Sequence, residues 1–354
     1  MTSVTVKASR TYEVQIGKGL LKKGGALLAS LLPPPRTVML VSDDRVFPLW
    51  GDILQTSLTE AGYTVKTFVF PNGEASKTTD TVVKLWNALA EAGLTRTDCL
   101  AALGGGVVGD LTGFAAATFL RGIPFVQFPT TLLAMVDSSV GGKTGADLTA
   151  GKNLVGAFNQ PIGVFCDTDA LSTLPPEIFA DGCAEVIKYG YINDPTLLKM
   201  LENDFSADPE AVIARCVADK RDVVEADERD TGMRQLLNLG HTAGHAVEAH
   251  SNFAISHGSA VAIGMVLMTR AAITEGICTP EVLPHMLQML KAYHLPTECP
   301  YDAATLAAIA MGDKKRAGSR ITLVLPQSIG QSILYPIQAT ELASFFAKGL
   351  EEFQ

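Results

Sequence analysis

The chain has 354 residues, of which 47% are hydrophobic and 18% are charged, and its formal net charge at pH 7 is −9. This length favours two domains, and the composition is that of globular proteins with large apolar cores, which excludes a disordered chain. Because Lys314-Lys315-Arg316 is the one basic run, we expect no nucleic-acid partner bound through a broad basic surface.

The cysteines are scattered and form no CxxC pair, which predicts free thiols in a reducing compartment. The first residues alternate like a strand and show no apolar signal core. No apolar run reaches the roughly 18 residues that span a bilayer. We therefore expect a cytoplasmic protein with no membrane partner.

The first half of the chain alternates strand and helix patterns. Residues 4–8 and 12–16 predict a hairpin, and two helices are predicted at 46–61 and 79–92. Short apolar strands are predicted at Val38–Val41, Val65–Phe70, Leu100–Leu103 and Phe125–Phe128. This alternation is typical of a mostly parallel sheet covered on both faces, so we expect residues 1–170 to form a Rossmann-like α/β domain.

Amphipathic helical patterns dominate after residue 170. They predict helices at 177–200, 209–227, 236–250, 258–275, 280–293 and 302–311. One hairpin, formed by ITLVLP and QSILYP, interrupts them. Residues 171–354 are therefore predicted to form a second, mainly α-helical domain.

A glycine-rich stretch, ALGGGVVGD, follows the predicted strand that ends at Leu103 and opens an apolar helical run. Gly104, Gly106 and Gly109 fit the GxGxxG pattern, in which backbone amides at a helix N-terminus approach a pyrophosphate. The alternative is tight packing of strand and helix without a ligand. No acid follows at the usual spacing, so the candidate for the ribose is Asp43, at the end of an earlier strand.

The stretch NLGHTAGHAVEAH concentrates histidines in a chain that is poor in them. On a helix, His241 and His245 lie four residues apart on one face, which Glu248 continues. His257 opens the next predicted helix, and Glu185, in AEVIKYG, lies on a separate one. A catalytic zinc takes three protein ligands, so these residues form a surplus that spacing does not resolve. The alternative is one buried histidine with the others on a solvated helix face.

The stretches DSSVGGKTG, from Asp137, and GKNL, which contains Lys152, combine lysines, hydroxyls and glycines between apolar flanks. This pattern favours a loop that wraps an anion over a solvated surface loop. Further basic candidates are Lys188, Lys220, Arg234 and Lys314. Together with a nucleotide and a metal, these cations indicate an anionic, polyhydroxylated substrate.

Several stretches together identify a resemblance. FPTTLLAMVDSSVGGKTGAD, GKNLVGAF, AEVIKYG, LLNLGHTAGHAVE, HGSAVAIGM and the late DKK resemble the 3-dehydroquinate synthase family, in order, over residues 38–325. The resemblance implies a nucleotide-binding domain, a helical metal-binding domain and an active site in the cleft between them. It also implies a homodimer that uses NAD and Zn2+ or Co2+ in the shikimate pathway to chorismate and the aromatic amino acids. The substrate would be 3-deoxy-arabino-heptulosonate 7-phosphate.

The same resemblance implies roles for individual residues. The metal ligands would be Glu185, His241 and His257. Residues around the reacting hydroxyls would be Asp137, Lys188, Lys220 and Asn238, with Arg234 on the carboxylate. The phosphate would be held by Lys143, Asn153, His245 and Lys314, with Arg121 arriving from a partner subunit. NAD contacts would come from Asp43, Glu74, Lys77, Gly105, Gly106, Val107, Asp110, Thr130, Thr131, Lys143, Lys152, Thr173 and Leu174.

The chain departs from the family's motifs at two places. Glu177-Ile178 stands where the family has Arg-Glu, which implies an altered NAD contact, and Ser259 replaces the acid of HGEAV. Alternative functions are another sugar-phosphate cyclase, a metal-dependent glycerol or alcohol dehydrogenase, and a non-catalytic NAD- or metal-binding protein. Arg234, as a carboxylate-binding residue, and the intact GKNLVGAF favour the dehydroquinate reaction over the sister cyclases.

Overall fold

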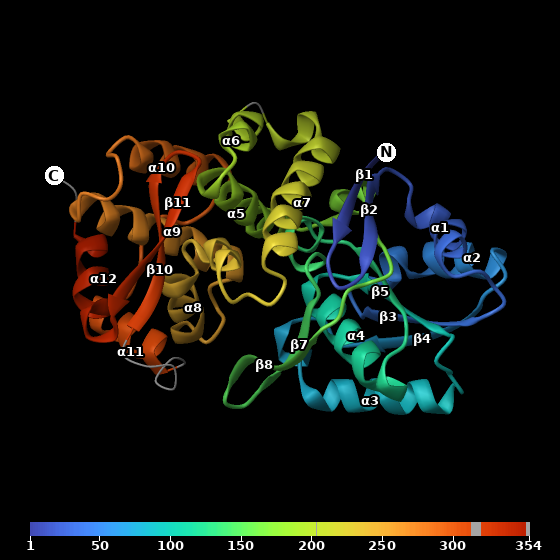
Figure 1. Cartoon of the computed structure of the whole chain (residues 1–354). Helices are drawn as coiled ribbons and strands as arrows, with labels where there is room; N and C mark the ends of the chain where they lie inside the picture. Colours follow the sequence, from blue (N-terminus) through green and yellow to red (C-terminus); the bar gives the residue numbers. More distant parts are fainter. Residues whose placement is uncertain (203, 313–319, 352–354) are drawn as a thin grey trace. The chain divides into compact units, whose positions relative to one another are not determined.

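The computed structural model describes residues 1–202, 204–312 and 320–351 (Figure 1). The chain forms two compact units. The N-terminal unit combines Met1–Pro175 with Pro209–Arg229, and the C-terminal unit combines Pro176–Asp208 with the chain from Asp230 onward. No helix among the described residues is both long and apolar enough to cross a membrane.

The N-terminal unit is built on one sheet, whose described strands run in the order β1-β2-β9-β6-β5-β3-β4. Their bounds are Thr2–Lys7 (β1), Thr11–Gly17 (β2), Thr37–Asp43 (β3), Thr64–Phe70 (β4), Cys99–Gly104 (β5), Phe125–Pro129 (β6) and Val164–Asp167 (β9). β1 and β2 form the predicted antiparallel hairpin, and the other neighbouring strands pair in parallel. The predicted mostly parallel sheet is therefore confirmed.

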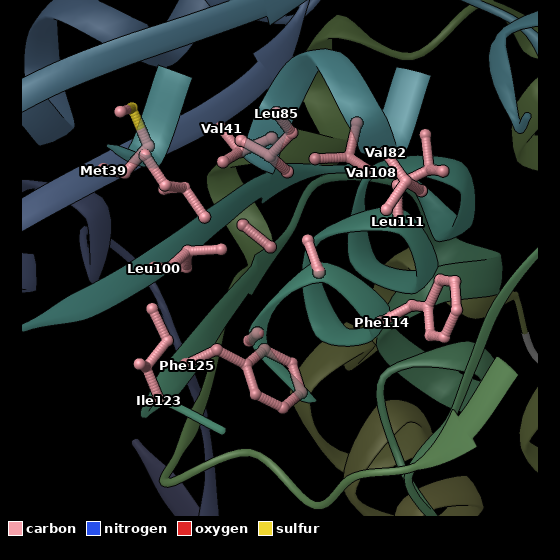
Figure 2. Packing of buried hydrophobic residues seen from close by; sticks show 14 of the residues in the cluster. Met39, Val41, Val82, Leu85, Leu100, Val108, Leu111, Phe114, Ile123 and Phe125 are labelled. Atoms are coloured by element: carbon pink, nitrogen blue, oxygen red, sulfur yellow. The ribbon is translucent and has the colours of Figure 1, made fainter. Parts of the chain in front are cut away.

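Helices cover both faces of this sheet (Figure 1). They are α1 (Gly24–Leu31), α2 (Asp52–Glu60), α3 (Thr79–Glu91) and α4 (Gly106–Thr118). Because side chains alternate along a strand, Met39 and Val41 of β3 belong to one core while its Val38 and Leu40 belong to the other. The first core meets α3 and α4, as Figure 2 shows, and the second meets α1 and α2. This two-sided burial explains the continuous apolar run in the sequence.

Part of the stretch expected to be an anion-wrapping loop, from Lys143 onward, forms a two-stranded hairpin. β7 (Lys143–Leu148) and β8 (Gly151–Phe158) pair antiparallel. Glycines allow the strands to approach closely, since a Cβ on Gly145 would lie 2.6 Å from the Val155 carbonyl oxygen. The glycines that indicated a loop thus serve close pairing of two strands.

Helix α7 (Pro209–Ala226) packs against β1 and β2, although the boundary expected at residue 170 assigned it to the second domain. Glu225 on this helix accepts the Lys7 amide at 2.6 Å, and Glu228 just beyond accepts the Ser9 amide at 2.8 Å. The helical pattern itself was predicted correctly. The side on which α7 packs depends on contacts that are distant in the sequence.

The C-terminal unit is mainly helical, as predicted. Its elements are α5 (Pro176–Ile192), α6 (Pro195–Glu202), α8 (His241–His250), α9 (His257–Thr274), α10 (Val282–Ala292), α11 (Ala303–Gly312), β10 (Arg320–Ser328), β11 (Gln331–Gln338) and α12 (Leu342–Leu350). The helix expected at 177–200 is divided into α5 and α6. The helix expected at 236–250 begins only at His241, because Gly240 has a φ of +79°. Most of α9 is buried, which makes this helix the centre of the unit.

Candidate functional site

The glycine-rich turn has the strand–turn–helix context that a phosphate site requires. β5 ends at Gly104, and α4 begins at Gly106 with Gly105 as its N-cap. The third glycine of the pattern, Gly109, lets α4 lie against β6, since a Cβ there would be 2.6 Å from Gln127 Oε1. The first turn of α4, which includes Val107, therefore combines amides without helical partners with the positive end of the helix dipole.

This turn lies where the strand order reverses. From β3 the chain continues to β4 on one side and to β5 on the other, and ligands of open α/β sheets bind at such switch points. Asp43 ends β3 and is buried, and it accepts the amides of Arg45 at 2.9 Å and Val46 at 2.8 Å. Thr130, followed by Thr131, comes directly after β6, and its amide bonds to the Gly104 carbonyl.

A connected polar network joins α4 to the β7–β8 hairpin. Lys77 Nζ lies 2.7 Å from Asp110 Oδ2 and donates to Asn153 Oδ1 at 2.6 Å. Burial alone would lower the pKa of Lys77, but the carboxylates of Asp110 and Glu74 outweigh it and raise that pKa. Lys152 pairs with Glu74 at 3.2 Å. The predicted cofactor residues of this region thus gather in one network within the N-terminal unit.

Sequence reasoning missed Asp147, which holds this network in place. Its Oδ1 accepts the Asn153 amide at 2.7 Å, and its own amide bonds to the Lys77 carbonyl. Asn153 has a φ of +54°, a left-handed conformation that asparagine tolerates better than most residues. The acid preceding GKN in the sequence was the available signal for this role.

The other predicted residues of the N-terminal unit have separate surroundings. Lys220 on α7 is buried, and its Nζ bonds to the Asp137 carbonyl at 2.6 Å and lies 3.0 Å from its carboxylate. Thr173 accepts the Trp50 indole at 3.1 Å, and Leu174 follows it. Lys143 is exposed at the start of β7. Arg121, just beyond α4, has a φ of +69°. Lys314 lies outside the described residues.

In the C-terminal unit, the three predicted metal ligands come together from three helices. Glu185 lies in α5 and is fully buried, while His241 and His257 are the first residues of α8 and α9. Glu185 Oε1 lies 3.5 Å from His241 Nε2 and 3.4 Å from His257 Nε2. His241 Nδ1 lies 3.1 Å from the Leu239 carbonyl, which orients the ring. Two imidazole nitrogens and one carboxylate oxygen form the donor set of a catalytic zinc site.

A second group of potential ligands shares His257 with the first. It consists of His245, Glu248 and His257, and Glu248 Oε2 lies 3.5 Å from His257 Nδ1. Glu185 and Glu248 approach different nitrogens of His257. Glu248 is buried whereas His245 is exposed, so the first group offers the more enclosed site.

The electrostatics of the two histidines differ. Burial, with Lys188 nearby, holds the pKa of His241 well below its ordinary value, which keeps its imidazole neutral and suited to a metal. Burial also acts to lower the pKa of His257, but hydrogen bonds to Glu185 and Glu248 outweigh it and raise that pKa to about 10. His257 is thus held between two carboxylates.

Two buried cations lie in the same unit. Lys188 forms an ion pair with Glu185 one turn away on α5 and is 1% exposed. Arg234 is 2% exposed and lies in a short 3-10 helix, Met233–Asn238, which Asn238 ends. Their burial excludes a solvated surface position for both side chains.

The combination of a parallel α/β unit that has a glycine-rich turn with a helical unit that has a His-His-Glu donor set is typical of nucleotide- and metal-dependent enzymes. Models of the N-terminal and C-terminal domains of 3-dehydroquinate synthase match residues 67–181 and 182–316. A 3-dehydroquinate synthase from Symbiobacterium thermophilum is 45% identical over 92% of this chain and 94% of its own. The chain therefore belongs to the 3-dehydroquinate synthase family and is an enzyme, as the sequence motifs predicted.

Solved structures of related cyclases share the whole fold. A 2-deoxy-scyllo-inosose synthase complexed with carbaglucose-6-phosphate, NAD+ and Co2+ is 26% identical, with a TM-score of 0.88 over 99% of this chain and 100% of that chain. A 2-epi-5-epi-valiolone synthase from Streptomyces hygroscopicus, with NAD+ and Zn2+ bound, is also 26% identical, with a TM-score of 0.87 over 98% of each chain.

Proposed function

We propose that the chain is an NAD- and divalent-metal-dependent lyase of the cytoplasm that converts 3-deoxy-arabino-heptulosonate 7-phosphate into 3-dehydroquinate and phosphate. The observation that carries the proposal is the convergence of Glu185, His241 and His257 in a member of this family. The donor set fits Zn2+ or Co2+, the ions bound in the two related cyclases. The glycine-rich turn fits the pyrophosphate of NAD.

NAD+ bound at the glycine-rich turn would supply a reversible hydride acceptor for C5 of the substrate, and a metal held by Glu185, His241 and His257 would polarise the oxygen at that carbon. The net redox change is therefore zero. Between the two hydride transfers, a proton leaves the carbon beside the new ketone and the C–O bond to phosphate breaks. The ring then opens, and an intramolecular aldol step closes the carbocycle.

The protein's own residues would bind and orient the substrate. Arg234 is buried and permanently charged, so we assign it to the substrate carboxylate. Lys220 pairs with the Asp137 carboxylate, and we assign this carboxylate to accept a hydrogen bond from a substrate hydroxyl. We assign Lys188 and Asn238 to the neighbouring hydroxyls. Phosphate binding is assigned to Lys143, Asn153, His245 and Lys314.

Cofactor contacts are proposed for the residues of the N-terminal unit. They are Asp43, Glu74, Lys77, Gly105, Gly106, Val107, Asp110, Thr130, Thr131, Lys143, Lys152, Thr173 and Leu174. We further propose a homodimer in which Arg121 serves the site of the second copy. Glu177 is exposed at the start of α5, so its departure from the family motif is expected to alter a peripheral NAD contact without abolishing activity.

The test is phosphate release from 3-deoxy-arabino-heptulosonate 7-phosphate with NAD+ in catalytic amounts, with and without a chelator. We expect chelator-sensitive release without accumulation of NADH. Stoichiometric NADH would indicate a dehydrogenase instead. No release from folded, metal-loaded protein, together with turnover of another sugar phosphate, would assign the chain to a sister cyclase.

A further inference from the structure

Helix α5 carries a second buried carboxylate one turn before Glu185. Asp181 is 9% exposed, and its Oδ1 accepts the Ser256 hydroxyl at 2.6 Å and the Ser259 amide at 3.1 Å. The Ser259 hydroxyl lies 3.4 Å from Asp181 Oδ1 and 2.9 Å from the Ser256 hydroxyl. One oxygen of Asp181 therefore collects the polar groups at the start of α9.

These contacts give α9 a cap that comes from another helix. Ser256 is the N-cap of α9, but its side chain makes no capping hydrogen bond within its own helix. The Ser259 amide belongs to the first turn, where amides have no helical partner, and Asp181 accepts it. A carboxylate at this end also complements the positive end of the helix dipole.

The backbones of the two helices touch at the same point. A Cβ on Gly258 would lie 2.4 Å from both the Cα and the carbonyl oxygen of Asp181. Neither of these atoms can move without moving α5. The first turn of α9 is therefore fixed against α5 by a backbone contact and by the hydrogen bonds of Asp181.

The contact lies directly beside the proposed metal ligands. Glu185 follows Asp181 by one helical turn, and His257 lies between the two serines that Asp181 holds. The Glu185 Oε1 to His257 Nε2 distance of 3.4 Å joins ligands from these two helices. A shift of α9 along α5 would change this distance directly, because His257 is the first residue of the helix.

We propose that Asp181 is a positioning residue of the metal site: its carboxylate fixes the start of α9 on α5 and so presents His257 to the metal beside Glu185. The inference rests on the proposed metal-dependent function. Residues that orient metal ligands typically change metal affinity by about 10–100-fold when they are replaced. Because Asp181 acts on His257 through the backbone of α9, we expect the lower end, about tenfold.

The test compares Asp181→Ala with Asp194→Ala, a control that also removes a buried carboxylate from the start of a helix. Asp194 is also buried in the C-terminal unit, where it caps α6 by accepting the amides of Thr196 at 3.1 Å and Leu197 at 3.3 Å. Metal-free full-length protein is titrated with Zn2+ against a chromophoric chelator. The visible spectrum of the Co2+ form reports the coordination geometry, and thermal unfolding of the metal-free form reports stability.

We expect Asp181→Ala to weaken Zn2+ binding about tenfold and to change the Co2+ spectrum. Asp194→Ala should lower the thermal midpoint, because it removes a helix cap, but leave both metal readouts as in the unaltered protein. Unchanged Zn2+ affinity in Asp181→Ala, or an equal loss of affinity in Asp194→Ala, would overturn the proposal. If the unaltered protein binds no Zn2+, the proposed metal-dependent function fails as well. If the unaltered protein binds Zn2+, the affinity of Asp181→Ala decides this inference alone.

Discussion

Glu248→Gln tests whether Glu248 supports metal binding by holding His257 at Nδ1. Glu248 Oε2 lies 3.5 Å from His257 Nδ1, and its side chain is 8% exposed. Glutamine keeps the size and one acceptor oxygen but removes the charge. A hydrogen bond to a charged group contributes about 1.5–3 kcal/mol. At about 1.4 kcal/mol per factor of ten, this corresponds to metal binding weaker by roughly 10- to 100-fold.

The assay is competition for Zn2+ between the metal-free protein and a chelator of known affinity. Three companion variants decide which donor set binds the ion. If Glu185, His241 and His257 are the ligands, Glu185→Gln and His257→Ala should lose binding, whereas His245→Ala should keep it. The reasoning is refuted if His245→Ala loses Zn2+ as completely as His257→Ala while Glu185→Gln retains it. That result would make Glu248 a ligand.

Two further predictions concern stability. Burial would raise the pKa of Asp98, but hydrogen bonds from backbone amides, including Thr95 at 2.6 Å, outweigh it and lower that pKa. The ionised Asp98 carboxylate therefore stabilises the fold above pH about 4. This stabilisation is lost as the pH falls through the lowered pKa of Asp98. Urea unfolding should show Asp98→Asn less stable by about 2 kcal/mol at pH 7, with the difference shrinking below pH about 4; a constant difference would contradict the assignment. Gly264→Ala would place a Cβ 2.0 Å from the Gly240 carbonyl oxygen. We therefore expect the free energy of unfolding, measured with urea, to fall by about 1–3 kcal/mol. Gly312→Ala is the control, because its Cβ would meet no atom of the described residues within 4 Å, and equal effects would contradict the packing argument.

Patterns within one element predicted most of the fold. The continuous apolar run of β3 predicted a buried strand, and the helical periodicity of 209–227 predicted α7 almost to its ends. Periodicity does not say which sheet or helix an amphipathic face will cover. The placement of α7 against β1 and β2 depends on pairs such as Lys7 with Glu225, which are 218 residues apart. The β7–β8 hairpin was missed for a different reason, because glycine indicates both loops and close strand pairing.

Spacing alone left four candidates for three metal positions. The helix period places His241 and His245 on one face, but their side chains join different potential ligand groups. His241 lies with Glu185 and His257, and His245 lies with Glu248 and His257. The family resemblance named Glu185, His241 and His257, and the structure brings these together. Asp181 had no signal of its own, since its partners lie 75 and 78 residues further along the chain.

The acids around these histidines have a common electrostatic explanation. His241 and His257 are the first residues of α8 and α9, so a cation bound by both would face the positive ends of two helix dipoles. Lys188 adds a further positive charge, as its ion pair with Glu185 shows. A divalent ion binds favourably there only if the negative charge of nearby carboxylates outweighs the repulsion from the two helix ends and from Lys188. Glu185 supplies one as a ligand, Glu248 approaches the second nitrogen of His257, and Asp181 caps α9 directly. On this argument, removal of any of the three charges weakens metal binding even where the donor atoms remain.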